Sequence, residues 1–393
     1  MRAAAMSSIM LVAGEASGDL HGATLARQLR RLAPSVSLTG MGGSRMAEAG
    51  VGLLFDVTRL AVVGGSEAVR RLPALYRTYR QLISRLKEAP PRAVVLIDFP
   101  EFNLRVARQA EHLGIPVIYF IPPQVWAWRP GRVRVIARIA SCVLVVFPFE
   151  VPLYESAGAR VKFVGHPLLD GLASPPARGE SRRSLGVPAE ATLVGLLPGS
   201  RREEVERLLP EMLRAAALIR GARPDVQFVL APAPTVDRAL VNSLLAVAPV
   251  PVPLAAGRAY EVMAASDLLV VASGTATLEA ALIGTPMVVC YRVSRVSRLV
   301  GRLLLRTPWI SLANIVAGRA VVPELLQDEA TGGRMAGEAL RLLGSPEALG
   351  AQRAAFAEVR GKLGTAGVGE RAARSVLEVA GLTIAAPLSA TGR

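Results

Sequence analysis

The chain has 393 residues, which is enough for two domains of ordinary size with well-buried cores. Its composition is 51% hydrophobic, but the longest candidate for a membrane span, residues 113–128, is broken by prolines and is too short to cross a bilayer. The formal net charge of +15 indicates an anionic partner, and no helix-turn-helix, zinc or RNA-binding signature supports nucleic acid in that role.

Cysteine, histidine and carboxylate spacing gives no sign of a metal site or a disulfide framework. Cys142 and Cys290 lie in apolar, strand-like runs, so we expect buried free thiols in a reducing cytoplasm. The three histidines form no cluster with cysteine, and no Asp-x-Asp pair occurs. We therefore expect no metal and no cofactor. The apolar run at residues 9–13 is too short for a signal peptide.

The first half of the chain alternates short apolar runs with segments of helical period. Most of the runs are continuously apolar, as parallel strands buried on both faces tend to be. Helices are predicted between most of them, for example at residues 21–32 and 101–113. The predicted strands are residues 8–13, 35–39, 93–97, 117–121, 141–146 and 161–164.

Residues 171–181 have the proline, glycine and serine content of a linker. The alternation then restarts, and the predicted elements are strands at 193–197, 226–230, 268–271 and 287–290 and helices at 201–220 and 275–283. Two such arrays predict an α/β fold of two doubly wound, Rossmann-like parallel sheets that face each other across a cleft. We expect domains at 1–171 and 182–350, then helices at 351–382 that return to the first domain or reach a partner chain. The tail at 383–393 is expected to be disordered.

Two βα turns in the second array have the pattern of a diphosphate site. LLPGSRREEVE at 196–206 and ASGTATLEAA at 272–281 each join an apolar strand to a helix through small residues. Such a turn directs backbone N–H groups and the positive end of a helix dipole at a ligand above the strand. The candidate residues are Gly199, Ser200, Arg201, Ser273, Thr275, Thr277 and Glu279.

Arg201 is the strongest of these candidates. Cations are disfavoured at a helix N-terminus, so an arginine there indicates a nearby anion, with which it can pair bidentately. Thr275 and Thr277 would add hydroxyl donors to the same phosphates. Glu279 either accepts from a ribose or complements the helix dipole from the first turn.

A series of motifs occurs in one order along the whole chain: GEASGDLHG (14–22), LIDFPEFN (96–103), PPQVWAWRPGR (122–132), FVGHPLLD (163–170), LLPGSRREEV (196–205), SGTATLEAAL (273–282) and TPWISLANIVAGRAVVPELLQ (307–327). Together they resemble lipid-A-disaccharide synthase, a family of inverting glycosyltransferases of GT-B architecture. The resemblance implies transfer of 2,3-diacylglucosamine from its UDP donor to the 6-hydroxyl of 2,3-diacylglucosamine 1-phosphate. The products would be a β-1,6-linked disaccharide 1-phosphate and UDP, in lipid A biosynthesis for the Gram-negative outer membrane.

The resemblance implies roles for residues of both halves. Asp98 follows the strand at 93–97, where α/β folds bind ligands, and would be the general base; the alternative is a cap on the helix that begins near Pro100. Asn314 and Gln327 are carried over as donor-pocket residues. The first βα turn would face the acceptor sugar and its phosphate, or is a plain capped turn. Its candidate contacts are Glu15, Ser17, Asp19 and His21.

Acylated substrates require contact with a bilayer, and residues 70–87 have the pattern of a basic amphipathic helix. The alternative is a surface helix packed on the core. The residues expected to face anionic lipid are Arg70, Arg71, Leu72, Leu75, Tyr76 and Arg77. A second basic stretch spans residues 292–306. The expected location is the cytoplasm, peripheral on the cytoplasmic face of the inner membrane.

Several interpretations stay open on the sequence alone. Trp126 and Trp128 gate the cleft or pack as an aromatic corner. A homodimer is left open by the C-terminal helices. The nearest alternative function is another nucleotide-sugar enzyme, such as a UDP-N-acetylglucosamine epimerase or the peptidoglycan glucosaminyltransferase. A non-enzymatic basic protein that binds membranes is the alternative from another class.

Overall fold

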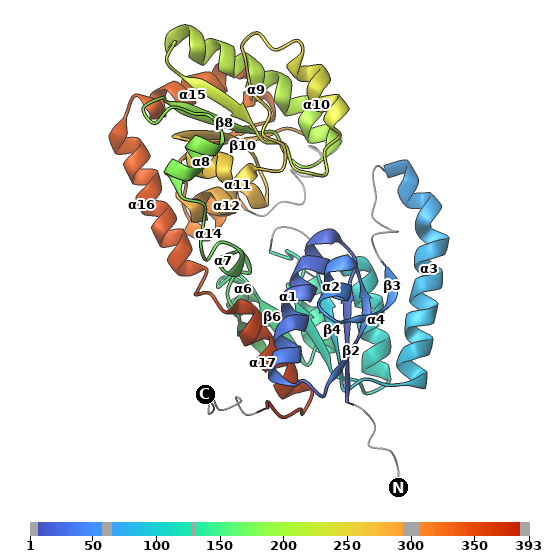
Figure 1. The fold of residues 1–393 in the computed structure, drawn as a ribbon. Coiled ribbons are helices and arrows are strands. Elements are labelled where there is room, and N and C mark those ends of the chain that lie inside the picture. Colours follow the sequence, from blue (N-terminus) through green and yellow to red (C-terminus); the bar gives the residue numbers. More distant parts are fainter. Residues whose placement is uncertain (1–6, 57–64, 127–130, 294–306, 386–393) are drawn as a thin grey trace, which may run out of the picture. The chain divides into compact units, whose positions relative to one another are not determined.

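The computed structural model describes residues 7–56, 65–126, 131–293 and 307–385, and of residues 65–72 it describes the backbone only (Figure 1). The chain forms two compact units. The first unit comprises Met1–Asp170 and Thr365–Arg393, and the second comprises Gly171–Gly364. Among the helices of the described ranges, none is both long and apolar enough to cross a membrane.

The first unit contains a seven-stranded sheet in the order β3-β2-β1-β4-β5-β6-β7. All its pairings are parallel. Its strands are β1 (Ser8–Ala13), β2 (Ser37–Gly42), β3 (Gly52–Asp56), β4 (Ala93–Ile97), β5 (Val117–Phe120), β6 (Cys142–Val145) and β7 (Val161–Phe163). The strand order reverses between β1 and β4, so the turns after these two strands lie next to each other at the carboxyl edge of the sheet.

Helices cover this sheet because their apolar faces pack on strands that are buried on both sides; β4 (AVVLI) is buried throughout. The helices of the first unit are α1 (Ala16–Leu32), α2 (Ser44–Glu48), α3 (Gly65–Glu88), α4 (Pro100–His112), α5 (Arg132–Ile139), α6 (Glu150–Glu155), α7 (Leu168–Gly171, at the boundary) and α17 (Val368–Val379).

The last helix, α17, packs on α1 in the first unit (Figure 1). Asp170 fixes the start of α17, because its carboxylate accepts hydrogen bonds from the N–H groups of Gly367 at 2.6 Å and Gly369 at 3.1 Å. Glu370 also pairs with Arg31 of α1 at 2.6 Å. The C-terminal segment therefore returns to the unit in which the chain began.

The second unit contains a five-stranded sheet in the order β12-β11-β10-β8-β9, again parallel throughout. Its strands are β8 (Leu193–Leu197), β9 (Gln227–Leu230), β10 (Leu268–Ala272), β11 (Met287–Tyr291) and β12 (Glu324–Leu326). Its helices are α8 (Arg178–Ser184), α9 (Arg202–Ala222), α10 (Arg238–Leu245), α11 (Ala259–Ala265), α12 (Thr275–Ile283), α14 (Leu312–Ala317), α15 (Gly332–Leu343) and α16 (Pro346–Lys362). Here the order reverses between β8 and β10, which places the two predicted diphosphate turns side by side.

The predicted fold class of two doubly wound parallel sheets is confirmed, with errors at the sheet edges. The sequence did not indicate β3 or β12, which are short and only partly buried. The second strand begins and ends later than predicted, at Ser37–Gly42. This strand can approach β1 closely because Gly40 has a φ of +152°, and a methyl group there would lie 1.8 Å from the carbonyl oxygen of Leu11.

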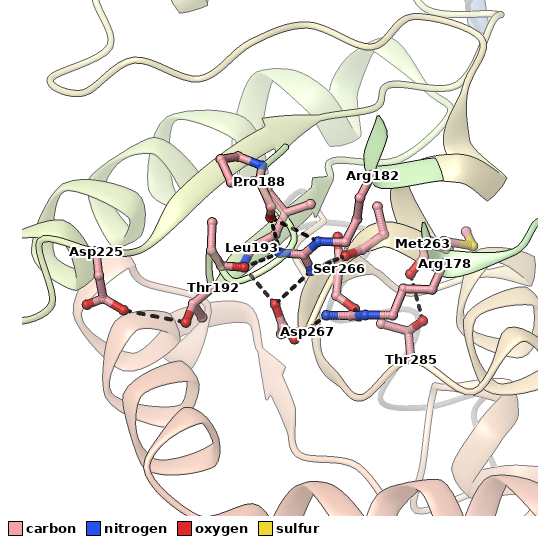
Figure 2. A network of polar contacts seen from close by, with 12 residues as sticks. Arg178, Arg182, Pro188, Thr192, Leu193, Asp225, Met263, Ser266, Asp267 and Thr285 are labelled. Carbon is pink, nitrogen blue, oxygen red and sulfur yellow. Dashed lines mark hydrogen bonds and ion pairs between the residues drawn. The ribbon is translucent and has the colours of Figure 1, made fainter. Parts of the chain in front are cut away.

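The predicted linker at 171–181 is wrong in its second half, because residues 178–181 belong to α8. The guanidinium of Arg182 is buried and donates to the carbonyl oxygens of Ala265 and Pro188. Figure 2 shows Arg182 beside Asp267, which also binds Arg178 at 2.6 Å. This polar network attaches α8 to the second sheet, so the segment is part of the unit.

Candidate active site

The turn after β4 has a backbone conformation that L-residues rarely adopt. Asp98 and Phe99 have φ values of 48° and 47°. The carbonyl oxygen of Asp98 accepts hydrogen bonds from the hydroxyl of Tyr119 at 3.0 Å and from Nδ2 of Asn103 at 2.7 Å. Each residue in such a conformation costs on the order of 1–3 kcal/mol and persists only when its surroundings hold it, which is typical of functional sites.

The carboxylate of Asp98 is perturbed by its surroundings. Burial first, and then the negative charge of Glu15, raise its pKa to about 6, while the Phe99 N–H lowers it. The predicted alternative, a helix cap, is wrong: residue 99 precedes α4 in a left-handed conformation, and no side chain caps that helix. Asp98 is thus a partly buried carboxylate, more basic than usual, at the edge of the sheet where ligands bind.

The first βα turn lies against this strained turn. Ala13 pairs with Ile97 in the sheet, and a methyl group at Gly14 would lie 2.1 Å from the ring of Phe99. Glu15 and Ser17 are exposed beyond it. Both side chains are therefore accessible to solvent, and the charge of Glu15 acts on Asp98.

Asp19 and His21 of the same turn are placed differently. Asp19 is buried, and its carboxylate accepts hydrogen bonds from the N–H groups of Gly43 at 2.7 Å and Met46 at 3.1 Å at the start of α2. Because its carboxylate is hydrogen-bonded to the start of α2, we interpret Asp19 as a residue that positions α2. Burial lowers the pKa of His21 to about 4, which keeps the imidazole neutral at physiological pH.

An aromatic corner follows β5 and β6. Trp126 packs edge-on against Phe149, with ring centroids 5.2 Å apart, and its indole N–H donates to Oε1 of Glu150 at 3.2 Å. Trp126 therefore packs as an aromatic corner, whereas Trp128 lies outside the described residues. Burial raises the pKa of Glu150 to about 7 and lowers that of nearby His166 to about 3.

The sequence did not indicate the residues that hold the Asp98 turn, or the buried carboxylate and imidazole of the same unit. Tyr119, Asn103, Glu150 and His166 carry no unusual spacing along the chain. Asn103 and His166 do lie inside two of the motifs that carry the family resemblance, at 96–103 and 163–170. The motifs were thus the only sequence signal for Asn103 and His166. The contacts of all these residues appear only in the folded chain.

The first diphosphate turn, after β8, exposes its arginine. Gly199 has a φ of +113° and leads into α9. The N–H groups of Ser200 and Arg201 donate to Oε2 of Glu204 at 3.1 and 3.3 Å. The side chain of Arg201 is 79% exposed. The guanidinium of Arg201 is thus accessible to an anion, whereas these two backbone donors already have a carboxylate partner.

The second diphosphate turn, after β10, is only partly available to a ligand. Gly274 and Thr275 are exposed. Thr277 is fully buried; its hydroxyl donates to the Gly274 carbonyl at 2.8 Å and accepts from the Leu312 N–H at 3.2 Å. The hydroxyl of Thr277 already has these two partners, and its contact with phosphate stays a prediction. The Ser273 hydroxyl donates to the carbonyl oxygen of residue 310 at 2.9 Å.

Glu279 lies on α12 beyond its first turn, so the alternative of a first-turn dipole partner is wrong. Oε1 of Glu279 accepts from the hydroxyl of Tyr260 at 2.9 Å. Burial raises the pKa of Glu279, and the Tyr260 hydrogen bond lowers it. The carboxylate keeps acceptor capacity that a ribose hydroxyl can use.

Asn314 does not have the free amide that a donor-pocket residue needs. It is 1% exposed, its Oδ1 accepts from the N–H groups of Val321 and Val322, and its Nδ2 donates to Glu324 at 2.8 Å. The amide forms hydrogen bonds with the loop before β12, and its contact with the donor stays a prediction. Gln327 accepts from the N–H of residue 293 at 3.3 Å and has a φ of 54°.

The amphipathic stripe on α3 packs mainly on the protein itself. Leu82 and Leu86 are fully buried, and Leu75 is partly buried against the same core, so its contact with lipid stays a prediction. Tyr76 is 60% exposed and Arg77 is also exposed. The side chains of Arg70, Arg71 and Leu72, and the second basic stretch from residue 294 to 306, lie outside the described residues.

Metal-binding groups are sparse in the part of the chain that the structure describes. No cluster of three or more histidine, cysteine, aspartate or glutamate side chains there has a spacing that could hold a metal ion. Cys142 and Cys290 are buried free thiols, as predicted.

Comparison with solved structures identifies proteins of the same fold. A UDP-GlcNAc 2-epimerase from Neisseria meningitidis, bound to UDP-GlcNAc, is 13% identical, with a TM-score of 0.63 over 94% of this chain and all of that one. The calicheamicin glycosyltransferase CalG4 is 17% identical, with a TM-score of 0.58 over 97% and 99% of the two chains. At these identities the likeness concerns the fold alone, and it is that of GT-B glycosyltransferases.

Comparison with known sequences is far more specific. The lipid-A-disaccharide synthase of Geobacter sulfurreducens is 46% identical over 373 residues, which cover 95% of this chain and 97% of that protein. That of Myxococcus xanthus is 45% identical over 373 residues, 94% and 97% of the two chains. The model of the family described as lipid-A-disaccharide synthetase matches residues 9–363. The chain therefore belongs to the lipid-A-disaccharide synthetase family and is a glycosyltransferase of lipid A biosynthesis.

Proposed function

We propose that the chain transfers a 2,3-diacylglucosaminyl unit from its UDP donor to the 6-hydroxyl of 2,3-diacylglucosamine 1-phosphate. The products are a β-1,6-linked disaccharide 1-phosphate and UDP. The main supporting observation is the partly buried carboxylate of Asp98, held in a strained turn where the order of the first sheet reverses.

Asp98 acts as the general base in this proposal. As the 6-hydroxyl oxygen attacks the anomeric carbon, Asp98 takes its proton, and the bond from that carbon to the UDP oxygen breaks on the opposite face. The anomeric configuration is therefore inverted. A base with a pKa near 6 is ionised at neutral pH and is a stronger proton acceptor than an ordinary aspartate.

Unit 2 binds the donor in this proposal. The guanidinium of Arg201 pairs with the diphosphate and stabilises the negative charge that develops as UDP leaves. Thr275, at the start of α12, contacts the same phosphates. Glu279 accepts a hydrogen bond from the ribose while it keeps that from Tyr260. Protein charge, rather than a metal ion, then neutralises the leaving group.

The transfer assay uses the full chain with radiolabelled UDP-2,3-diacylglucosamine and 2,3-diacylglucosamine 1-phosphate. We expect a labelled disaccharide 1-phosphate and one UDP released for each disaccharide formed. UDP-N-acetylglucosamine with the same protein is the control, and we expect neither epimerisation nor transfer. Release of UDP without disaccharide, or epimerisation of the control sugar, would contradict the proposal.

We propose further that the protein works at the cytoplasmic face of the inner membrane, where its acylated substrates lie. The net charge of +15 supports attraction to anionic lipid, and Tyr76 and Arg77 are exposed on α3. We expect the double variant Tyr76→Ser, Arg77→Glu to float less with liposomes containing anionic lipid. Arg341→Glu, a reversal of an exposed arginine in the second unit, is the matched control. Equal flotation of all three proteins would contradict docking through α3.

A further inference from the structure

A carboxylate of the chain already occupies the two backbone donors of the first diphosphate turn. Oε2 of Glu204 accepts from the N–H groups of Ser200 and Arg201 at 3.1 and 3.3 Å, and Oε1 lies 3.4 Å from Nη1 of Arg201. The Glu204 side chain is only 13% exposed, whereas that of Arg201 is 79% exposed. The turn thus places its carboxylate inside and its guanidinium outside.

The glycine of the turn is fitted to this carboxylate. A methyl group at Gly199 would lie 2.5 Å from Oε2 of Glu204, and the φ of +113° disfavours any other residue. Tyr291 ends β11, which β10 separates from β8, and the charges of Glu204 and Arg201 both act on its hydroxyl. Burial and Glu204 raise the pKa of its hydroxyl, and Arg201 lowers it. The carboxylate of Glu204 therefore contacts both the backbone of the turn and the guanidinium of Arg201.

We infer that Glu204 is a positioning residue for the donor: it holds the turn closed through the Ser200 and Arg201 N–H groups and directs the Arg201 guanidinium toward the diphosphate. This inference rests on the proposed function. In it, the phosphate binds the guanidinium, and the two N–H groups stay with Glu204 throughout. The opposite arrangement is a placeholder, in which the diphosphate displaces Glu204 and takes over its two donors.

The two arrangements predict changes of opposite sign in UDP affinity. Removal of a positioning residue loosens the turn, so Glu204→Ala should raise the Kd for UDP and the KM for the donor about tenfold, which corresponds to about 1.4 kcal/mol. Because the acceptor and the base belong to the other unit, the acceptor KM and kcat should change less than threefold. Removal of a placeholder would lower the Kd, since no carboxylate would compete with the phosphate.

Two conservative variants make the test robust if Glu204→Ala folds poorly. Glu204→Gln keeps an acceptor oxygen at the same reach, so we expect its Kd for UDP to stay within threefold of the wild-type value. Glu204→Asp keeps the charge but is shorter by one methylene group, so it should weaken UDP binding as the alanine variant does. Glu203→Ala, at a 77% exposed neighbour, is the matched control and should leave the Kd unchanged.

Titration calorimetry with UDP, combined with donor and acceptor KM values, reads out all four variants. Weaker binding in Glu204→Ala and Glu204→Asp, with near-normal binding in Glu204→Gln, supports the inference. Tighter binding in the alanine or glutamine variant, or an unchanged Kd in the alanine and aspartate variants, overturns it. Failure of the wild-type protein to bind UDP would instead overturn the proposed function, so the two failures are distinguishable.

Discussion

The two units place their charged side chains in turns of the same kind but in opposite environments. In the first unit, the turn after β4 forces two non-glycine residues into a left-handed conformation and partly buries the carboxylate of Asp98. In the second unit, the turn after β8 gives its positive φ to Gly199 and exposes the guanidinium of Arg201. The turn after β4 is strained and raises the pKa of its carboxylate, whereas the turn after β8 is relaxed and leaves its guanidinium exposed to water.

This difference matches the chemistry proposed for each unit. Proton transfer needs a base whose pKa lies near the working pH. Burial raises the pKa of a carboxylate into that range. Binding of a diphosphate needs a cation that stays charged and accessible, and an arginine satisfies this without burial. Strain and burial thus mark the turn that we propose to be catalytic, and neither is needed at the turn that we propose to bind the donor.

The largest expected effect is that of Asp98→Asn on turnover. The amide has the shape of the carboxylate but cannot accept the proton, so kcat should fall by about 10²–10⁴-fold in the transfer assay. Asp225→Asn, at an exposed carboxylate that pairs with Arg223, is the control and should keep full activity. Near-normal turnover in the Asp98 variant would remove the distinction between the two turns.

The stability of Asp98→Asn checks the same turn independently. Because the folded pKa is raised from 3.8 to about 6, the unfolded chain releases this proton first, and stability falls as pH rises from about 4 to 6. Above pH 6 the loss amounts to at most about 3 kcal/mol. The variant removes this loss, so its melting temperature should exceed that of the wild type at pH 8, with a smaller difference at pH 4.5. A lower melting temperature at pH 8 would show that burial of Asp98 is not unfavourable.

Asn314→Ala should affect folding rather than donor binding. The substitution leaves the partly buried N–H of Val321 and the buried N–H of Val322 without acceptors, which should cost about 3 kcal/mol of stability in the second unit. Thermal unfolding measures this loss, and UDP calorimetry on the folded variant should give a Kd within threefold of the wild-type value. A large loss of affinity in a normally stable variant would restore Asn314 as a donor contact.

Arg201→Ala should weaken UDP binding about 10- to 100-fold, since a charge-assisted hydrogen bond contributes about 1.5–3 kcal/mol. Arg202→Ala is the matched control, because that neighbouring arginine pairs with Glu206 at 2.7 Å. The Kd from calorimetry and the donor KM should change together for Arg201 and not for Arg202. Equal effects of the two variants would mean that general positive charge, not the turn, binds the donor.

The smallest expected effect is the pH dependence within the normal working range. Since the base acts when ionised, kcat/KM should fall below pH 6, by about tenfold for each further pH unit. The buried carboxylate of Glu150, with a pKa raised to about 7, is another group of the first unit that titrates in this range. In the Glu150→Gln variant, kcat/KM should still fall below about pH 6. If kcat/KM of that variant no longer fell below pH 6, the pH dependence would belong to Glu150 instead of Asp98.

Much of the fold could be predicted from the sequence, because long buried strands leave a clear pattern. Residues 8–13, 93–97 and 193–197 were predicted to the residue, since both faces of these strands are covered and the runs are continuously apolar. Edge strands such as β3 and β12 have three to five partly buried residues, and so give little signal. Likewise, the stripe on α3 indicated an apolar face but not which surface covers it.

The candidate site was predictable in position but not in detail. The end of an apolar strand located Asp98, but its strain depends on Tyr119 and Asn103, which meet it only through the fold. Motif residues serve both binding and structure, and sequence alone does not separate the two roles. Thr277 and Asn314 lie in the motifs, yet their polar groups form hydrogen bonds with the backbone. Arg201 lies in the same kind of motif and is exposed.

The most direct test of the division between a catalytic turn and a binding turn is a single calorimetric series. UDP is titrated into the wild-type protein, Asp98→Asn and Arg201→Ala under identical conditions. We predict the same Kd for the wild type and Asp98→Asn, whose turnover is lost, and a Kd raised about 10- to 100-fold for Arg201→Ala. A loss of UDP affinity in Asp98→Asn, or unchanged affinity in Arg201→Ala, would contradict the assignment of chemistry to the first unit and donor binding to the second.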